Sequence, residues 1–357
     1  PGATGLSPER ASRCRNVKSL SMSSTVSQAA TVRQPLLSVR DLRVHFTIRA
    51  DGQWPWSPSR TLKAVDGVSF DLYPGETLGV VGESGCGKST MARALLNLVP
   101  ATDGSIVWEG REMRGADPKA WLAQRKVAQM IFQDPLASLD PRMTVAQIIG
   151  EPLHTHCPEL SADEHRARVL AMMQRVGLTA QQINRYPHEF SGGQCQRIGI
   201  ARALILRPKV VICDEPVSAL DVSIQAQIIN LLKELQAEMG LALIFIAHDL
   251  AVVKHISQRV MVMYLGRAME MASKHALYDT PRHPYTQALL SAIPLPDPKA
   301  ERNKRIQLLQ GDLPSPINQP TGCVFRTRCP KAVAQCAQAV PGLRDVGPET
   351  RSACILD

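Results

Sequence analysis

The sequence has no long hydrophobic run. Its longest, LALIFIA at 241–247, is far short of the roughly 20 apolar residues that cross a bilayer, so we expect any membrane role to depend on a partner. Residues 1–35 also lack the apolar core of a secretory signal and are rich in Ser, Ala and Arg. We expect them to be a disordered tail, with the natural start at Met22 and residues 1–21 preceding it. An organellar transit peptide is the alternative.

Aromatic residues are scarce, at 4% of the chain, and acidic residues are outnumbered by basic ones, 32 to 41. The net charge of +9 is uneven: residues 1–35 hold five basic and one acidic residue, 36–280 hold 26 and 25, and 281–357 hold ten and six. A basic surface can bind nucleic acid or a membrane. Scattered basic residues without interleaved aromatics are more typical of a solvated surface, and we expect no nucleic-acid partner.

The order of the apolar runs predicts an α/β fold. Residues 36–82 contain short runs rich in Val, Leu and Phe, typical of strands, with a long hairpin loop at 47–63. From residue 209 onward, the runs VVIC, LALIFIA and RVMVMYL alternate with helical patterns, including an amphipathic helix at about 223–239. Such alternation is typical of a parallel sheet covered by helices.

Two further segments differ from this pattern. Residues 134–207 are mainly helical in pattern, and Ser161 and Glu164 have capping-box spacing. The helix that they begin places its apolar residues on one face, where we expect core packing: Val169, Leu170, Met172, Met173 and Val176. After about residue 281 the sequence becomes Pro-rich and irregular, and we expect a second, smaller module there.

Nine residues, GESGCGKST at 82–90, fit the pattern G-x-x-x-x-G-K-[ST] of a phosphate-binding loop. They follow an apolar run and precede an apolar helix, which is the context that the motif requires. Glycines let backbone N–H groups surround phosphates, and the helix N-terminus adds partial positive charge. We expect Lys88 to neutralise the β- and γ-phosphates and Ser89 to bind Mg²⁺. The expected ATP-binding residues here are Gly82, Ser84, Gly85, Cys86, Gly87, Lys88, Ser89 and Thr90.

Two adjacent acids, Asp214 and Glu215, end the apolar run VVIC. A carboxylate at the C-terminal end of a buried strand faces the ligand crevice of an α/β sheet. We expect Asp214 to hold Mg²⁺ and Glu215 to polarise the attacking water as a general base. Alone, the two acids could equally be a solvated strand end; the phosphate loop upstream favours catalysis.

The stretch FSGGQCQRIGIARAL at 190–204 decides the family resemblance. Ser191 can cap a helix whose first turn contains Gly192 and Gly193, leaving N–H donors exposed for an anion. From about residue 36 to the end, the sequence resembles the nucleotide-binding subunits of ABC transporters, whose signature is LSGGQ, and its motifs follow the family's order. Two departures are Phe190 in place of the signature's Leu and Cys195 at a commonly basic position.

The resemblance implies an ABC-type ATPase domain over residues 36–280, with a RecA-like parallel-sheet core, an antiparallel β subdomain and a helical subdomain at about 134–207. Gln133 would touch Mg²⁺ and relay to membrane subunits, and His248 would act at the γ-phosphate. Phe46 would stack on adenine. A D-loop would lie at 218–221. In a head-to-tail dimer the partner's ATP site would be completed by Ser191, Gly192, Gly193, Gln194 and Asp221, so a lone monomer would hydrolyse ATP poorly.

Segments such as TPRHPYTQALLSAIP and GDLPSPINQPTGC resemble the ATPases of dipeptide and oligopeptide importers, most closely the second ATPase subunit of the dipeptide system. This implies an ATPase coupled to transport, held at the cytoplasmic face of the inner membrane. Its partners would be a homologous ATPase in a heterodimer, two transmembrane permeases and an extracytoplasmic peptide-binding protein. The same ATPase type also serves nickel, glutathione and other small solutes. A soluble ABC ATPase acting on nucleic acid and a non-catalytic cassette are further alternatives.

Four of nine cysteines lie in the extension at 281–357, spaced C-x5-C-x6-C-x17-C: Cys323, Cys329, Cys336 and Cys354. A reducing cytosol disfavours disulfides, and the spacing matches neither common zinc nor common ferredoxin patterns. The residues alone leave a metal site and unrelated thiols open. The family resemblance implies a [4Fe–4S] cluster on these cysteines, with zinc as the alternative. Arg326, Arg328 and Lys331 would offset its charge.

Overall fold

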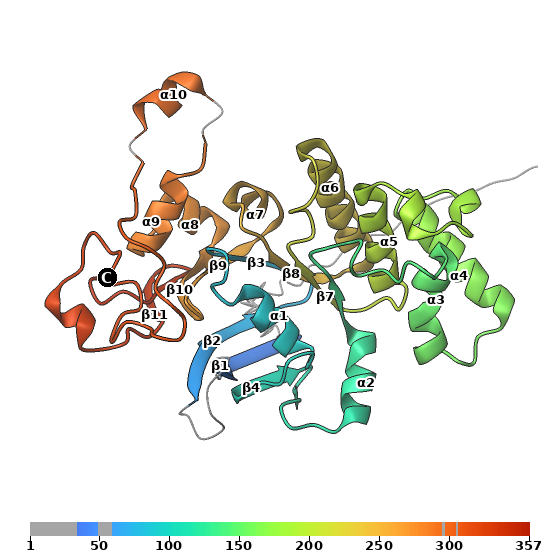
Figure 1. Cartoon of the computed structure of the whole chain (residues 1–357), viewed down its shortest axis with the longest axis horizontal. Helices are drawn as coiled ribbons and strands as arrows, with labels where there is room; N and C mark the ends of the chain where they lie inside the picture. Colours follow the sequence, from blue (N-terminus) through green and yellow to red (C-terminus); the bar gives the residue numbers. More distant parts are fainter. Residues whose placement is uncertain (1–33, 49–58, 295–296, 305) are drawn as a thin grey trace, which may run out of the picture. The chain divides into compact units, whose positions relative to one another are not determined.

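An eight-stranded sheet forms the centre of this computed structural model, which describes residues 34–48, 59–294, 297–304 and 306–357 (Figure 1). The strand order is β11-β12-β10-β9-β3-β8-β7-β6. The pairings among β3, β6, β7, β8 and β9 are parallel, whereas β10, β11 and β12 pair antiparallel. The strands are β3 (Thr77–Val81), β6 (Ala128–Ile131), β7 (Val210–Asp214), β8 (Ala242–Ile246), β9 (Arg259–Tyr264), β10 (Arg267–Ser273), β11 (Arg344–Gly347) and β12 (Thr350–Ser352).

The central strands are buried on both faces. Along β7, Val211 and Cys213 pack into one apolar cluster, while Val210 and Ile212 pack into another on the opposite side. Successive side chains of a strand point to opposite faces. Each continuous apolar run therefore packs alternate side chains into the cores on the two faces of the sheet. A parallel sheet covered by helices on both faces requires such runs.

Helices α1 (Lys88–Leu95), α6 (Val222–Met239) and α7 (Leu250–Ile256) each follow a strand of this sheet. Helix α6 buries one face, formed by Ile228, Ile229, Leu231, Leu232 and Leu235. Its bounds agree with the amphipathic helix predicted at about 223–239. The strand–helix alternation after residue 209 is likewise confirmed.

A separate antiparallel sheet of four strands has the order β2-β1-β4-β5. Its strands are β1 (Leu37–Ile48), β2 (Arg60–Leu72), β4 (Asp103–Trp108) and β5 (Arg111–Glu112), and α2 (Pro118–Val127) follows. The hairpin loop predicted at 47–63 is shorter, because β1 extends to Ile48 and β2 begins at Arg60. Most of that loop, and the tail at 1–33, lie outside the described residues.

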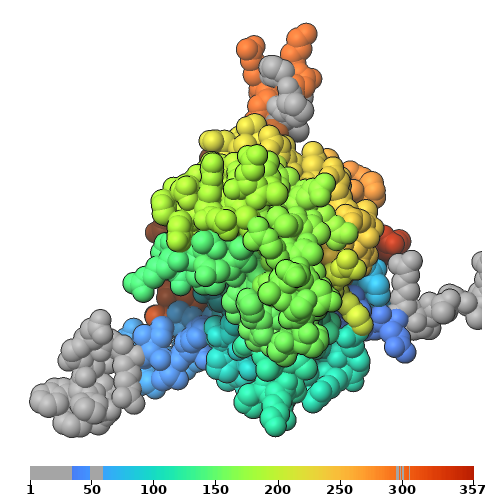
Figure 2. All heavy atoms as spheres, turned by 90° about the vertical axis from the view of Figure 1, so that its right-hand side faces the viewer, coloured from blue at the N-terminus to red at the C-terminus, as the bar shows by residue number. Residues whose placement is uncertain are grey.

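The segment at 134–207 is helical, as predicted, with α3 (Val145–His156), α4 (Ala162–Arg175) and α5 (Gly192–Leu204) and short 3₁₀ turns at Ala180–Gln182 and Pro187–Glu189. These residues, green to yellow-green in Figure 2, cover much of the face turned toward the viewer. The capping box of Ser161 and Glu164 is present at the start of α4. Met172 and Met173 are buried, so they are core residues, as expected.

Helix α8 (Lys274–Asp279) follows β10. The C-terminal extension at 281–357 holds α9 (Pro284–Ser291), α10 (Pro298–Asn303), a 3₁₀ turn at Ala334–Ala337 and the strands β11 and β12. Most of the rest is irregular, but β12 pairs with β10 and so extends the central sheet. The described helices include none with the length and apolarity that crossing a membrane needs.

Candidate active site

The phosphate loop lies between β3 and α1, as the sequence predicts. Two of its glycines are fixed by close backbone contacts: a Cβ on Gly82 would overlap the carbonyl oxygen of Met263, and one on Gly87 would overlap that of Ala64. Gly87 also has φ 104°, a left-handed conformation that side chains strain. The loop is therefore held between β9 and β2, with its N–H groups at the start of α1.

Lys88 is 3% exposed and turns back into the loop. Its Nζ donates to the carbonyl oxygens of Gly82 at 2.8 Å and Glu83 at 3.1 Å. The ammonium group is thus positioned beside the loop that would carry phosphates, and its other hydrogen-bond acceptor in the described residues is the Cys86 sulfur at 3.8 Å. An anionic phosphate is the partner that this arrangement favours.

Ser89 and Asp214 are brought together from α1 and the end of β7. The Ser89 hydroxyl donates to Asp214 Oδ1 at 2.7 Å. Asp214 is fully buried, its Oδ2 has no hydrogen-bond partner, and burial raises the pKa of its carboxyl group. A buried carboxylate oxygen without a partner, next to a hydroxyl, is an oxygen-donor set that fits Mg²⁺.

Glu215, Gln133 and His248 also meet. Gln133 Nε2 donates to Glu215 Oε2 at 2.9 Å, and His248 Nδ1 lies 3.7 Å from the same oxygen. Glu215 has φ 45°, and its amide donates to the carbonyl oxygen of Ile246 in β8 at 3.0 Å. A non-glycine residue in this conformation costs of order 1–3 kcal/mol. The backbone at the C-terminal ends of β7 and β8 therefore holds the Glu215 carboxylate beside Asp214.

Phe46 lies in β1, opposite Leu62 of β2, and its side chain is 39% exposed. Strand β2 also supplies Ala64, which packs on the phosphate loop. Phe46 is therefore an exposed aromatic residue on the sheet that holds the loop, and its stacking on adenine stays a prediction.

The predicted signature residues form a different region. Ser191 caps α5: its hydroxyl accepts from the Gln194 amide at 3.4 Å, while the Gln194 side chain accepts from the Ser191 amide at 3.0 Å. A Cβ on Gly193 would lie 2.6 Å from Ile224 Cγ2. Asp221 precedes α6 as its N-cap residue but makes no capping hydrogen bond. Within the described ranges, no hydrogen bond or ion pair joins these residues to the phosphate loop.

Comparisons with known proteins agree with this geometry. Residues 65–218 match the model of the ABC transporter family, and 269–336 match the oligopeptide/dipeptide transporter C-terminal region. The oligopeptide transport ATP-binding protein OppF of Escherichia coli is 67% identical over 311 residues, which are 87% of this chain and 93% of that protein. The chain belongs to the family of oligopeptide transport ATP-binding proteins. This confirms the resemblance seen in the sequence.

Other members of this ABC family agree. OppF of Haemophilus influenzae is 62% identical, covering 90% of this chain and 97% of that protein. Among solved structures, a dimer of the ATP-binding cassette MJ0796 bound to ADP and Pi matches with a TM-score of 0.59 and 26% identity, covering 67% of this chain and 98% of that one. The chain therefore has the expected ABC cassette fold and is an ATPase of the transport-coupled class.

The four C-terminal cysteines of this ABC ATPase share one region. The Cys323 amide donates to the Cys336 carbonyl at 2.8 Å, and both residues are buried, whereas Cys329 and Cys354 are half-buried. Burial raises the pKa of the Cys323 thiol, and the other three thiols raise it further. The described residues nevertheless contain no group of three or more His, Cys, Asp or Glu arranged to hold a metal ion. The predicted cluster is therefore not confirmed.

The three basic residues expected to offset the cluster's charge have other partners. Arg326 Nε donates to the Thr321 carbonyl at 2.8 Å, and Lys331 Nζ to the Gln287 side chain at 3.2 Å. Arg328 pairs with Glu83 in the phosphate loop at 2.8 Å. The sequence analysis assigns no role to Glu83, because the loop motif does not specify the residue at this position. The presence of a charged residue there was the one sign of an ion pair.

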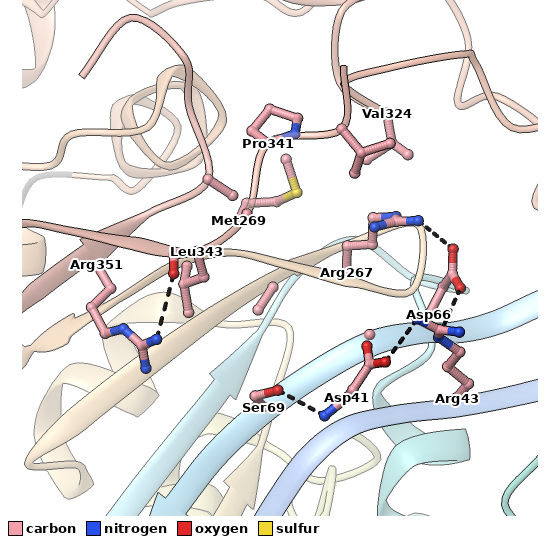
Figure 3. Close-up of a pocket in the computed structure, with 15 residues that line it drawn as sticks. Asp41, Arg43, Asp66, Ser69, Arg267, Met269, Val324, Pro341, Leu343 and Arg351 are labelled. Carbon is pink, nitrogen blue, oxygen red and sulfur yellow. Dashed lines mark hydrogen bonds and ion pairs between the residues drawn. The ribbon is translucent and has the colours of Figure 1, made fainter. Parts of the chain in front are cut away.

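A cavity of about 320 Å³ lies between β1, β2, β10 and the C-terminal extension (Figure 3). Four of its charged side chains pair with one another: Arg267 contacts Asp66, and Arg43 Nη2 lies 2.7 Å from Asp41. Arg351 lies apart from them and donates to the Leu343 carbonyl at 3.4 Å. Such mutual pairing is typical of a joint between two layers rather than of a ligand site. The cavity therefore marks where the antiparallel sheet meets the central sheet.

Proposed function

We propose that this chain is the ATP-hydrolysing subunit of an importer for dipeptides or oligopeptides. The cargo is supported by the names of relatives at 62–67% identity. The ATPase mechanism is carried by one observation: the Glu215 carboxylate is fixed by Gln133 next to the buried Asp214, which accepts a hydrogen bond from Ser89.

In this mechanism Lys88 and the loop amides bind the β- and γ-phosphates. Ser89, Asp214 and Gln133 would hold Mg²⁺, which neutralises charge on the phosphate oxygens. Glu215 orients the attacking water and accepts its proton as general base, an assignment that its position at the strand end supports. His248, 3.7 Å from Glu215, would contact the γ-phosphate.

The test replaces Glu215 by Gln, which keeps its size but removes the base. We expect the rate of ATP hydrolysis to fall by about 10²–10⁴-fold, with ATP binding retained. Glu238→Gln is the control, because Glu238 is 51% exposed and pairs with Arg175 on the surface of α6. Near-normal turnover by Glu215→Gln would refute the assignment of the base.

The signature residues are proposed to complete the ATP site of a homologous ATPase in a head-to-tail heterodimer. The capped end of α5, with Gly192 and Gly193 in its first turn, supports this role, as does its separation from the chain's own phosphate loop. Hydrolysis per chain should then rise when the partner ATPase is added. Full-rate hydrolysis by a proven monomer would contradict the proposal.

The chain is proposed to dock to two permeases at the cytoplasmic face of the inner membrane. A groove of about 610 Å³ beside Gln133 is the proposed contact surface. Seven apolar residues and eight polar or charged ones, Gln133 among them, line the groove, and Leu98 is 48% exposed. Exposed apolar surface of this kind marks interaction sites. We expect Leu98→Glu to abolish co-purification with the permeases, while Leu122→Glu, at a 42% exposed position outside the groove, has no effect. An extracytoplasmic peptide-binding protein completes the proposed importer.

For the cysteine region we propose a structural [4Fe–4S] cluster held by Cys323, Cys329, Cys336 and Cys354, with zinc as the alternative. The proposal is supported by the donor set, since four thiolates suffice for either metal centre, and by the shared location of the thiols. Anaerobic purification followed by iron, sulfide and zinc analysis tests it. Colourless protein with stoichiometric zinc would exclude the cluster.

The nucleic-acid alternative is disfavoured by the partners of the basic residues in the extension. Arg344 Nη2 donates to the carbonyl oxygens of Cys354 and Asp357 at 2.8 and 2.7 Å, and Lys304 Nζ contacts the Ile293 carbonyl. Arg326, Arg328 and Lys331 are engaged within the chain as well. These five of the ten basic residues of this region are thus engaged in hydrogen bonds within the chain.

A further inference from the structure

Glu83, the first variable residue of the phosphate loop, is held by the C-terminal extension. Nη1 of Arg328 donates to both of its carboxylate oxygens, at 3.0 and 2.8 Å, across 245 residues of sequence. The hydroxyl of Tyr285 accepts from the Glu83 amide at 3.1 Å. The Arg328 and Glu83 side chains are only 11% and 25% exposed. A shielded, charge-assisted pair of this kind is stronger than an ion pair on the surface.

Glu83 is also part of the turn that positions the lysine. Its carbonyl accepts from Lys88 Nζ at 3.1 Å and from the Cys86 amide at 3.2 Å. Arg328 and Lys88 therefore bind opposite ends of one residue. A shift of Glu83 would move a carbonyl that holds the lysine's ammonium group.

Arg328 itself packs beside a buried cluster of aromatic rings. The rings of Tyr264, Tyr285 and Phe325 are fully buried, and their centroids lie 4.8–5.3 Å apart. The Arg328 guanidinium lies 5.9 Å from the centroid of Tyr264. Phe325 belongs to the segment 323–336, which carries three of the four C-terminal cysteines. The packing of this segment thus fixes the position of Arg328.

We propose that Arg328 is a positioning residue for ATP binding, through which the segment 323–336 controls the phosphate loop. The inference rests on the proposed function, because it assumes that this loop binds ATP. Without the guanidinium, Glu83 would leave an uncompensated negative charge close to the phosphates. The loop would also lose a fixed point at its first turn. Both effects weaken the binding of a polyanion.

The test uses the full-length chain with Arg328→Gln, Glu83→Gln, both changes together, and Arg326→Gln. Arg326 is the matched control, since it lies two residues from Arg328 but hydrogen-bonds to Thr321. Affinity is measured with a fluorescent ATP analogue and Mg²⁺, and amide hydrogen exchange is followed at residues 82–88. We expect Arg328→Gln to remove the charge-assisted pair with Glu83, to weaken ATP binding about tenfold, and to speed amide hydrogen exchange in the loop.

Arg326→Gln should behave as wild type, and the double variant should regain part of the lost affinity because the free carboxylate is gone. Wild-type affinity and loop exchange in folded Arg328→Gln would overturn the inference, as would an equal loss in Arg326→Gln. If Arg328→Gln does not fold, unchanged loop exchange in Glu83→Gln overturns it. A wild-type chain that does not bind the analogue overturns the proposed function, and the inference with it.

Discussion

Asp66 joins the antiparallel sheet to the central sheet, and its replacement measures what that joint contributes to stability. The Asp66 side chain is 7% exposed, lies 3.2 Å from His45 Nε2 and contacts Arg267 of β10. Breaking a buried ion pair costs roughly 3–5 kcal/mol, but Arg267 keeps 27% of its side chain exposed and can be rehydrated. We expect Asp66→Asn to lower the free energy of unfolding by about 2 kcal/mol, which for a chain of 357 residues corresponds to a fall in melting temperature of about 3 °C.

The effect has a defined pH dependence. Burial acts to raise the pKa of Asp66, but Arg267 and two other basic neighbours outweigh it, so the pKa is lowered. The ion pairs therefore stabilise the fold fully above the ordinary carboxyl pKa of the unfolded chain. This stabilisation is lost as the pH falls through the lowered pKa of the folded state. The difference in melting temperature between wild type and Asp66→Asn should be constant above about pH 5 and shrink below about pH 4.

Thermal unfolding of the two chains across this pH range is the assay. Asp103→Asn is the matched control, since Asp103 is 54% exposed and lies 3.3 Å from Arg114 in the same sheet. Exposed pairs contribute about 0–1 kcal/mol, so the control should melt close to wild type. An Asp66→Asn chain that melts with wild type, or a control that loses as much, would refute the reasoning.

Three further substitutions test the site. Gly87→Ala puts a Cβ against the carbonyl oxygen of Ala64 at φ 104°, so binding of an ATP analogue should be lost; intact binding would contradict this. Cys86→Ser should leave ATPase activity close to wild type, because the thiol is 1% exposed, burial raises its pKa, and it fills space as a neutral group. Gly193→Ala, 2.6 Å from Ile224, should lower hydrolysis by the assembled dimer while the isolated chain still binds ATP. Equal loss of binding would show a defect in the fold.

Local features of the molecule could be predicted from sequence. The phosphate loop, the caps of Ser161 and Ser191 and the helix at 223–239 depend on residues within one or two turns of one another, so motif and periodicity suffice. The contact between Gln133 and Glu215 could be predicted only through the family resemblance, because they lie 82 positions apart in the sequence. The pairing of β12 with β10 had no signal, since strands of three residues are too short for a periodic pattern.

The variable positions of the phosphate loop mark where prediction from the motif ends. The motif fixes the residues that touch phosphate, because backbone geometry and charge require them. At the variable positions the neighbours of the loop decide. Cys86 fills a buried space, and Glu83 pairs with a half-buried arginine of the extension, Arg328. Glu83 therefore shows how this chain's own extension packs on the phosphate loop, which is information that a family pattern omits.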